Sequence, residues 1–280
     1  MKKYLALILA LVMAVMAFAA CGKKTEEPAA PTGEDAAASN TDLTEISDAA
    51  YVLGKGKLVV GITDFAPMDY KDESGEWVGF DADLARAFAE SLGIGIEFVE
   101  IVWDNKIIEL DSKVIDCVWN GMTLTDEVTS AMNCTEPYCN NAQVIVIPAD
   151  KAEAYTSVES VKDLTFAVEA GSAGEAVATE NGFKTTPVTA QADAVMEVAA
   201  GTSDAAIIDS LMAAAMVGEG TSYDKLTYVL PLNSEEYGVG FRKGSDLTGM
   251  LNAFFADAYA KGTVASLAEK YGVSAAIISK

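Results

Sequence analysis

Short apolar runs alternate with amphipathic segments along the chain from residue 57 onward. The runs at 58–62, 96–101 and 114–119 are rich in branched apolar residues and are typical of strands. The segments 80–92 and 104–112 between them carry apolar residues at helical spacing, and a third helix is expected after Thr125. This order, β-α-β-α-β, indicates a parallel sheet with helices on its faces. Within the first predicted helix, Asp81 is the expected N-cap, Leu84, Phe88 and Leu92 form the apolar face, and Gly93 ends the helix.

The same unit recurs in the second half of the chain. Strands are predicted at 164–168, 184–188 and 205–208, and helices at 172–180, 192–199 and 210–216. Two such units imply two α/β domains, each with its ligand face at the carboxyl ends of its strands.

Two extended segments are expected to join these domains. The run 142–147 crosses from the first to the second, and 237–241 returns as a strand before two helices at 250–259 and 263–271. We therefore predict two lobes, each a mostly parallel sheet flanked by helices, joined by a two-strand hinge that can close around a ligand. Lobe 1 comprises residues 53–144 and 234–280, and lobe 2 comprises residues 145–233.

The first residues predict the compartment. Lys2 and Lys3 precede an apolar run at 4–20 that ends in small residues before Cys21, which is the pattern of a secretory signal. The ending resembles a bacterial lipobox, so residues 1–20 are expected to be a lipoprotein signal peptide and Cys21 to be lipidated. The protein would then sit on the outer face of the cytoplasmic membrane, held by its acyl chains. A single transmembrane anchor is the alternative, although the run is short for one.

Residues 21–52 are expected to be a disordered acidic tether. The segment after Cys21 is rich in Ala, Pro, Thr, Glu and Asp and poor in large apolar residues, so it cannot bury enough surface to become ordered. The folded part is predicted to begin near Leu53.

Composition excludes several classes of function. A net charge of −23 argues against nucleic-acid binding, which needs clustered Lys and Arg. The absence of histidine removes the usual metal ligand and general base, so no metal and no cofactor are expected. Cys117, Cys134 and Cys139 cannot all pair; free buried thiols are preferred over a bridge between Cys134 and Cys139, and over metal ligation.

The segment 116–128 reads D-C-V-W-N-G-M-T-L-T-D-E-V. Apolar residues run into Gly121, and Thr123 and Thr125 follow with acids behind them, which predicts a strand that turns sharply into a helix. Such a turn directs backbone N–H groups and hydroxyls at one point and suits a carboxylate.

This segment and several others resemble the family 3 extracellular solute-binding proteins, the receptors of polar amino acid ABC transporters. The resemblance covers residues 57–280 and implies a two-lobed periplasmic-binding-protein-like fold. The matching motifs are Phe65-Ala66-Pro67-Met68, G-E-W-V-G-F-D-A-D at 75–83, Glu136-Pro137-Tyr138, Tyr237-Gly238, Arg242-Lys243-Gly244 and Gly262-Thr263.

The resemblance implies a ligand site assembled from both lobes. Phe65 and Trp103 would form its walls, although either could be ordinary core. Asp209, after the strand 205–208, matches the acid that pairs with a ligand's ammonium group. The carboxylate would be contacted by the segments Asn120, Gly121, Met122, Thr123 and Gly171, Ser172, Ala173, whose turns could instead be simple helix caps.

Val128 departs from the family, which usually has arginine at this position. That arginine grips a carboxylate bidentately, and a desolvated carboxylate without a cation would cost about 3–5 kcal/mol. Lys106 could supply the missing charge, or be a solvated helix lysine. A second version is that the ligand has no α-carboxylate.

The resemblance implies a membrane-anchored, monomeric receptor of an ABC importer. It would capture an amino acid or similar small polar amine by hinge closure and deliver it to permease subunits. The alternative is a dehydratase-like enzyme that uses Glu175 as its general acid, although an acid in a first helical turn is also favourable in itself.

Overall fold

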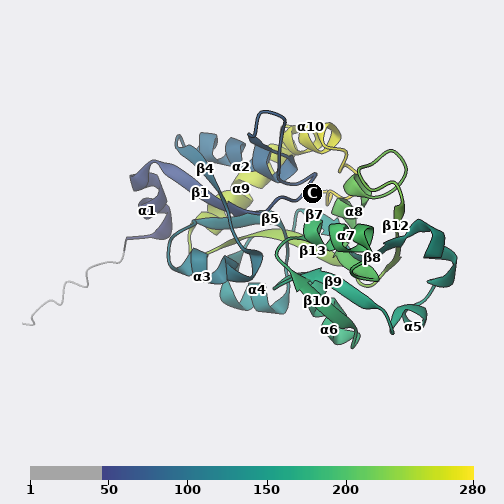
Figure 1. The fold of residues 1–280 in the computed structure, drawn as a ribbon. Helices are drawn as coiled ribbons and strands as arrows, with labels where there is room; N and C mark the ends of the chain where they lie inside the picture. Colours follow the sequence, from purple (N-terminus) through teal and green to yellow (C-terminus); the bar gives the residue numbers. More distant parts are fainter. Residues whose placement is uncertain (1–45) are drawn as a thin grey trace, which may run out of the picture. The chain divides into compact units, whose positions relative to one another are not determined.

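The computed structural model describes residues 46–280 (Figure 1). One mixed sheet has the order β4-β1-β5-β13-β6, with β7 also paired to β13. β4, β1 and β5 are parallel and are connected through helices, whereas β13 runs antiparallel to β5, β6 and β7. Its strands are β1 (Lys57–Ile62), β4 (Gly95–Glu100), β5 (Cys117–Thr123), β6 (Asn133–Cys134), β7 (Cys139–Asn141) and β13 (Glu235–Phe241).

The second sheet repeats this plan with the order β10-β9-β11-β8-β12. β10, β9 and β11 are parallel, and the crossing strand β8 is antiparallel to both of its neighbours. The strands are β8 (Gln143–Pro148), β9 (Thr165–Glu169), β10 (Lys184–Val188), β11 (Ala205–Asp209) and β12 (Leu226–Pro231).

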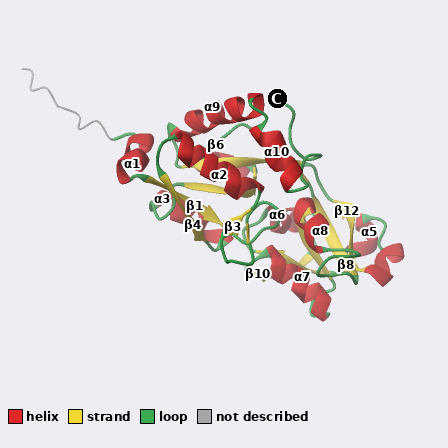
Figure 2. Ribbon diagram, turned by 90° about the horizontal axis from the view of Figure 1, so that it is seen from above, coloured by secondary structure: helices red, strands yellow, loops and turns green. Residues whose placement is uncertain are grey.

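Helices cover the faces of both sheets. In Figure 2 the first sheet lies at one end of the described part of the chain, together with α1, α2 and α9. The second sheet lies at the other end, together with α5, α7 and α8. The helices are α1 (Asp48–Lys55), α2 (Phe80–Ser91), the 3-10 turn η1 (Trp103–Asn105), α3 (Lys106–Asp111), α4 (Asp126–Ala131), the 3-10 turn η2 (Ala149–Ala154), α5 (Val158–Val161), α6 (Ala173–Glu180), α7 (Gln191–Ala200), α8 (Ser210–Met216), α9 (Leu247–Ala260) and α10 (Thr263–Lys270), and a small hairpin pairs β2 (Tyr70–Lys71) with β3 (Trp77–Val78).

The predicted two-lobed α/β fold is confirmed. The chain passes from the first sheet to the second between β7 and β8, and returns between β12 and β13. Each sheet is mixed because the crossing strands enter it in the direction opposite to its parallel half. The predicted lobe boundaries remain a prediction. Between residues 46 and 280, no helix combines the length and apolarity that a membrane span needs.

The chain becomes regular earlier than the sequence predicted. The signal peptide, Cys21 and most of the predicted tether lie outside the described residues, but residues 48–52 belong to helix α1 rather than to a disordered segment. The Ser47 side chain accepts a hydrogen bond from Ala50 N, and Gly56 ends the helix in the left-handed conformation. Ala49 and Val52 are buried, so α1 is part of the folded unit.

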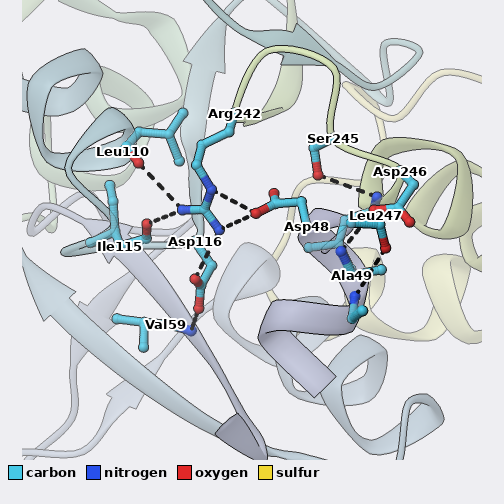
Figure 3. Close-up of polar contacts among 12 residues, drawn as sticks. Asp48, Ala49, Val59, Leu110, Ile115, Asp116, Arg242, Ser245, Asp246 and Leu247 are labelled. Atoms are coloured by element: carbon cyan, nitrogen blue, oxygen red, sulfur yellow. Dashed lines mark hydrogen bonds and ion pairs between the residues drawn. The ribbon is translucent and has the colours of Figure 1, made fainter. Parts of the chain in front are cut away.

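An ion-pair cluster fastens α1 to the first lobe (Figure 3). The Arg242 guanidinium bonds Asp48 of α1 at 2.7 Å and Asp116 at 3.1 Å, and donates to the Ile115 carbonyl at 2.7 Å. Asp116 also accepts from Val59 N and pairs with Lys55. Because Asp116 is fully buried, these donors replace the water that its charge has lost.

Asp81 is not the N-cap that the sequence predicted. Gly79 precedes α2 without a side-chain cap, and Asp81 lies inside the helix, fully buried. Its carboxylate accepts hydrogen bonds from Gly121 N at 2.7 Å and from the Tyr138 hydroxyl at 2.7 Å. Asp81 therefore ties α2 to β5 across the core instead of starting the helix.

Candidate ligand-binding cleft

A cavity of about 770 Å³ lies between the two lobes. Its first-lobe wall consists of η1, the start of α3 and the segment from β5 into α4. The second-lobe wall consists of the ends of β9 and β11, one side of α6 along its whole length and the start of α7. The returning crossover, residues 233–236, completes the lining. Thus the carboxyl ends of the parallel strands from both sheets face one space, as this architecture dictates.

The structure brings nearly all of the predicted site residues to this cavity. Phe65 is the exception: it is buried, its ring packs edge-on against Tyr237, and it lies behind Gly121. A Cβ at Gly121 would be 2.4 Å from the Phe65 ring. The predicted residues that line the cavity are Trp103, Lys106, Asn120, Gly121, Met122, Thr123, Val128, Ser172, Ala173 and Asp209.

The first-lobe segment differs in detail from the predicted sharp turn at Gly121. β5 continues through Gly121, which adopts φ +54°, to Thr123, and the helix begins only at Asp126. The Gly121 N–H is used by Asp81, and the Thr123 hydroxyl donates to Glu235 at 2.9 Å. Thr125 caps α4 by accepting from Val128 N. The Gly121 N–H and the Thr123 hydroxyl, which were expected to bind a ligand carboxylate, therefore donate to side chains of the protein itself.

Asp209, at the end of β11, is only 5% exposed and is surrounded by donors. Its Oδ1 accepts from Asn141, from Gln143 at 3.1 Å and from the Tyr237 hydroxyl at 2.7 Å. Its Oδ2 accepts from Gln191. Burial raises the pKa of Asp209 to about 7, and the neighbouring charge of Glu235 adds to the rise.

Glu235 is a cleft residue that the sequence did not reveal. Its Oε1 accepts from Gln143 at 2.8 Å, Asn141 at 2.6 Å and Thr123, and its Oε2 accepts from Asn233 at 2.8 Å. Asn141 and Gln143 flank one crossover, and Asn233 lies in the other. Shared amide donors thus connect Asp209 to both hinge segments. The sequence around Glu235 gave no indication that this residue accepts hydrogen bonds from both crossovers.

Lys106 lies across the opening between the lobes. Its ammonium donates to the Gly171 carbonyl of the second lobe at 2.9 Å and to the Trp103 carbonyl at 3.3 Å, and lies 5.1 Å from the centre of the Trp103 ring. Lys106 is 3% exposed, so it is not the solvated lysine that was the alternative. Burial lowers its pKa, although Glu127, Asp104 and Glu169 oppose the shift.

The second-lobe turn has the predicted form. Ser172 caps α6 by accepting from Glu175 N at 3.1 Å, and Gly171 is left-handed at φ +70°. The Glu175 carboxylate accepts from Gly171 N at 2.8 Å, and Glu175 is absent from the cavity lining. The position of Glu175 fits an acid that is favourable in the first turn of a helix rather than a general acid in the cleft.

The sequence of the folded part matches a known family. Residues 58–274 fit the model of the bacterial extracellular solute-binding proteins, family 3. The chain belongs to this family. The arginine-binding extracellular protein ArtP of Bacillus subtilis is 33% identical over 237 residues, which cover 80% of this chain and 89% of ArtP.

Solved structures agree with this family assignment. A mutant of ArgBP from T. maritima superposes with a TM-score of 0.75 at 32% identity, covering 80% of this chain and 98% of its own. The ancestral amino acid-binding protein AncCDT-1, described as a precursor of cyclohexadienyl dehydratase, gives a TM-score of 0.72 at 32% identity. The match covers 79% of this chain and 97% of AncCDT-1. The chain is therefore a solute-binding protein of the extracellular family 3 type.

The cleft of this family 3 protein is strongly acidic. Lys106 is the one cationic side chain among the residues of the lining, all of which lie in the described part of the chain, and it forms no ion pair there. Val128, 3% exposed, contributes an apolar side chain to the lining. The acids of the lining are Asp126, Glu127, Glu169, Glu180, Asp209, Glu235 and Glu236.

The three cysteines of the described residues are free. Cys117 and Cys139 are buried, and Cys134 is half-buried. Burial raises the pKa of Cys134 to about 11, so this thiol stays protonated at neutral pH. The cysteines thus behave as small apolar side chains, as the sequence analysis preferred.

Proposed function

We propose that this protein is the membrane-anchored, substrate-binding component of an ABC importer, and that it captures an amino acid or a similar small polar amine by hinge closure. The surroundings of Asp209 are the observation on which the proposal rests. It is a buried carboxylate at the carboxyl end of a strand, it lines a cavity between two hinged lobes, and it has no cationic partner in the described structure. A guest with an ammonium group would provide that partner.

Contacts between the lobes support closure as the capture step. The Lys106–Gly171 hydrogen bond joins α3 to the second-lobe turn. Gly171 also lies so close to Asp104 that an added Cβ would be 2.8 Å from the Asp104 Cα. Such contacts form only when the lobes approach, and a ligand that touches both walls favours the state in which they exist.

Lys106 is proposed to take the role of the missing family arginine. It is the cation that faces the cavity, whereas Val128 offers only an apolar surface. An ammonium group gives a point charge instead of a two-pronged grip, so the carboxylate of a ligand would be held less tightly than by arginine. Trp103 would cover the apolar part of the ligand.

The remaining parts of the proposal come from the sequence and from the relatives. Lipidation at Cys21 would hold the receptor on the outer face of the cytoplasmic membrane, where the closed form would meet permease subunits. ArtP and ArgBP, by their names, bind arginine, which carries the α-ammonium that Asp209 would accept. A basic amino acid is thus a natural first ligand to try.

The test is titration calorimetry of the purified protein with the common amino acids and with simple amines. We expect at least one of them to bind. Asp209→Asn keeps the size of the side chain but removes the charge, and should weaken binding about a hundredfold, because it strips one partner from a buried charge pair.

Glu153→Gln is the matched control, since Glu153 is an exposed acid of η2, away from the cleft. It should leave the affinity unchanged. Failure of every amino acid and amine to bind the wild-type protein would contradict the proposed function, and so would unchanged affinity in Asp209→Asn.

A further inference from the structure

Glu169 is a second buried acid of the cleft, and one oxygen of its carboxyl group has no hydrogen-bond donor. It is the last residue of β9, is 2% exposed and lines the cavity. Its Oε1 is inaccessible to solvent and has no hydrogen-bond partner. By contrast, Glu127 and Glu180 of the lining are exposed, and Glu235 is held by amides and a hydroxyl. An unpartnered buried carboxyl is costly unless something else satisfies it.

Glu169 and Asp209 lie at the same end of neighbouring parallel strands. β9 and β11 pair in register at Phe166 with Ala205 and at Ala167 with Ala206, so both strands deliver their last residue to the cleft. Burial raises the pKa of Glu169 to about 8, and the proximity of Asp209 is the next cause. The charge of Lys106 and a hydrogen bond from Gln191 oppose the rise in the pKa, but the Lys106 ammonium bonds only carbonyl oxygens. The protein itself therefore supplies no cation in contact with either acid.

We propose that the cleft takes a small molecule with two cationic nitrogen groups, one bound by Asp209 and the other by Glu169. This inference rests on the proposed function and specifies its ligand class. Diamines and amino acids with a basic side chain both meet the requirement. The unpartnered oxygen of Glu169 then receives a charged donor, and both buried acids are neutralised by the guest.

Paired ligands that differ by one charge test the inference. L-Ornithine is L-norvaline with a terminal amine, and 1,4-diaminobutane is 1-aminobutane with a second amine. In calorimetric titrations of the wild-type protein, the member of each pair that carries two amines should bind about ten- to a hundredfold more tightly, which is the range for a hydrogen bond to a charged group.

Glu169→Gln should reduce this preference in both pairs to about twofold, because an amide keeps the shape of the side chain but offers no charge. Binding of the one-charge members should persist, which also shows that the variant folds. Glu153→Gln, with its exposed acid, should keep the full wild-type preference.

The pH dependence provides a readout that a merely structural Glu169 would not give. With pKa values raised to about 8 for Glu169 and about 7 for Asp209, the empty cleft holds protons near neutrality. A dication must displace them, so its affinity should rise between pH 6 and pH 8. The rise should be smaller in Glu169→Gln, which has lost one of the two titrating groups.

The inference and the proposed function fail in different ways. If L-norvaline and 1-aminobutane bind as tightly as their partners, or if Glu169→Gln keeps the wild-type preference, the inference is overturned while the receptor function stands. The same holds if only amino acids without a second cation bind. If no amino acid or amine binds at all, the proposed function falls, and the inference with it.

Discussion

Asp209 accepts three hydrogen bonds on Oδ1 but only one, from Gln191, on Oδ2. Oδ2 is thus the oxygen with room for a further donor. Asp81 is equally buried, but its donors are Gly121 N and the Tyr138 hydroxyl, both of the first lobe, and it does not line the cavity. The two buried aspartates therefore differ in position: Asp209 lines the cavity between the lobes, and Asp81 lies in the core of the first lobe.

The sequence predicted the position of some cleft residues but not of others. Asp209 was predicted because an acid directly after a buried strand is a poor core residue and because it fits the family pattern. Glu235 and Glu169 were missed. Their meaning depends on neighbours remote in the chain, such as Asn141 for Glu235 and Asp209 for Glu169. Phe65 was placed in the ligand site by resemblance, but it packs behind Gly121, since the absent Cβ leaves room there.

The variant Lys106→Met distinguishes a ligand whose carboxylate is bound by Lys106 from a ligand that has no α-carboxylate. L-Ornithine differs from 1,4-diaminobutane by its carboxylate alone. If Lys106 replaces the family arginine, the variant should lose about tenfold or more in affinity for L-ornithine, because a charged partner is removed. Its affinity for 1,4-diaminobutane should change far less. Calorimetry provides both values.

Lys151→Met is the control, since Lys151 is exposed in η2 and distant from the lining. Equal affinities of Lys106→Met and the wild-type protein for L-ornithine would rule out the relocated cation. The version in which the natural ligand has no α-carboxylate would then be preferred.

Elements followed the hydrophobic pattern closely where a strand or helix buries one face by itself. The predicted helix at 210–216 is α8, and the predicted strand at 205–208 lies within β11, whose residues are all buried. β12 was not predicted, although its segment L-T-Y-V-L-P is apolar enough for a strand. α1 was assigned to the tether, although Ser47 and Gly56 are good start and stop signals, because its neighbours toward the N-terminus have a disordered composition.

The anchoring of α1 predicts a large stability effect. Arg242→Met leaves Asp116 fully buried with Lys55 as its remaining cation, and also releases Asp48. The free energy of unfolding should fall by about 3 kcal/mol, the lower end for breaking a buried ion pair. Urea denaturation of the purified protein measures the change.

Lys261→Met provides the comparison, because the Lys261–Asp257 pair lies on the surface with both side chains more than half exposed. Solvent screens such a pair, so its loss should have little effect. A stability of Arg242→Met equal to that of Lys261→Met would show that the cluster in Figure 3 does not hold α1 in place.

At the scale of the whole molecule, the repeated β-α-β units and the two extended segments predicted two lobes and a hinge, and the family assignment supports them. The sequence could not show how the lobes meet. The approach of Gly171 to Asp104 and the hydrogen bond from Lys106 to Gly171 depend on how the two lobes pack, which no local pattern encodes. The cavity lies at this same junction, and residues of both lobes form its walls.

The most direct measurement is a crystal structure of the protein with the tightest-binding ligand of the paired set. We expect one cationic nitrogen within hydrogen-bond distance of the Asp209 carboxylate, a second one at Glu169, and the Lys106–Gly171 contact retained. A ligand bound outside the cavity, or bound inside it with neither acid in contact with a nitrogen, would contradict the account.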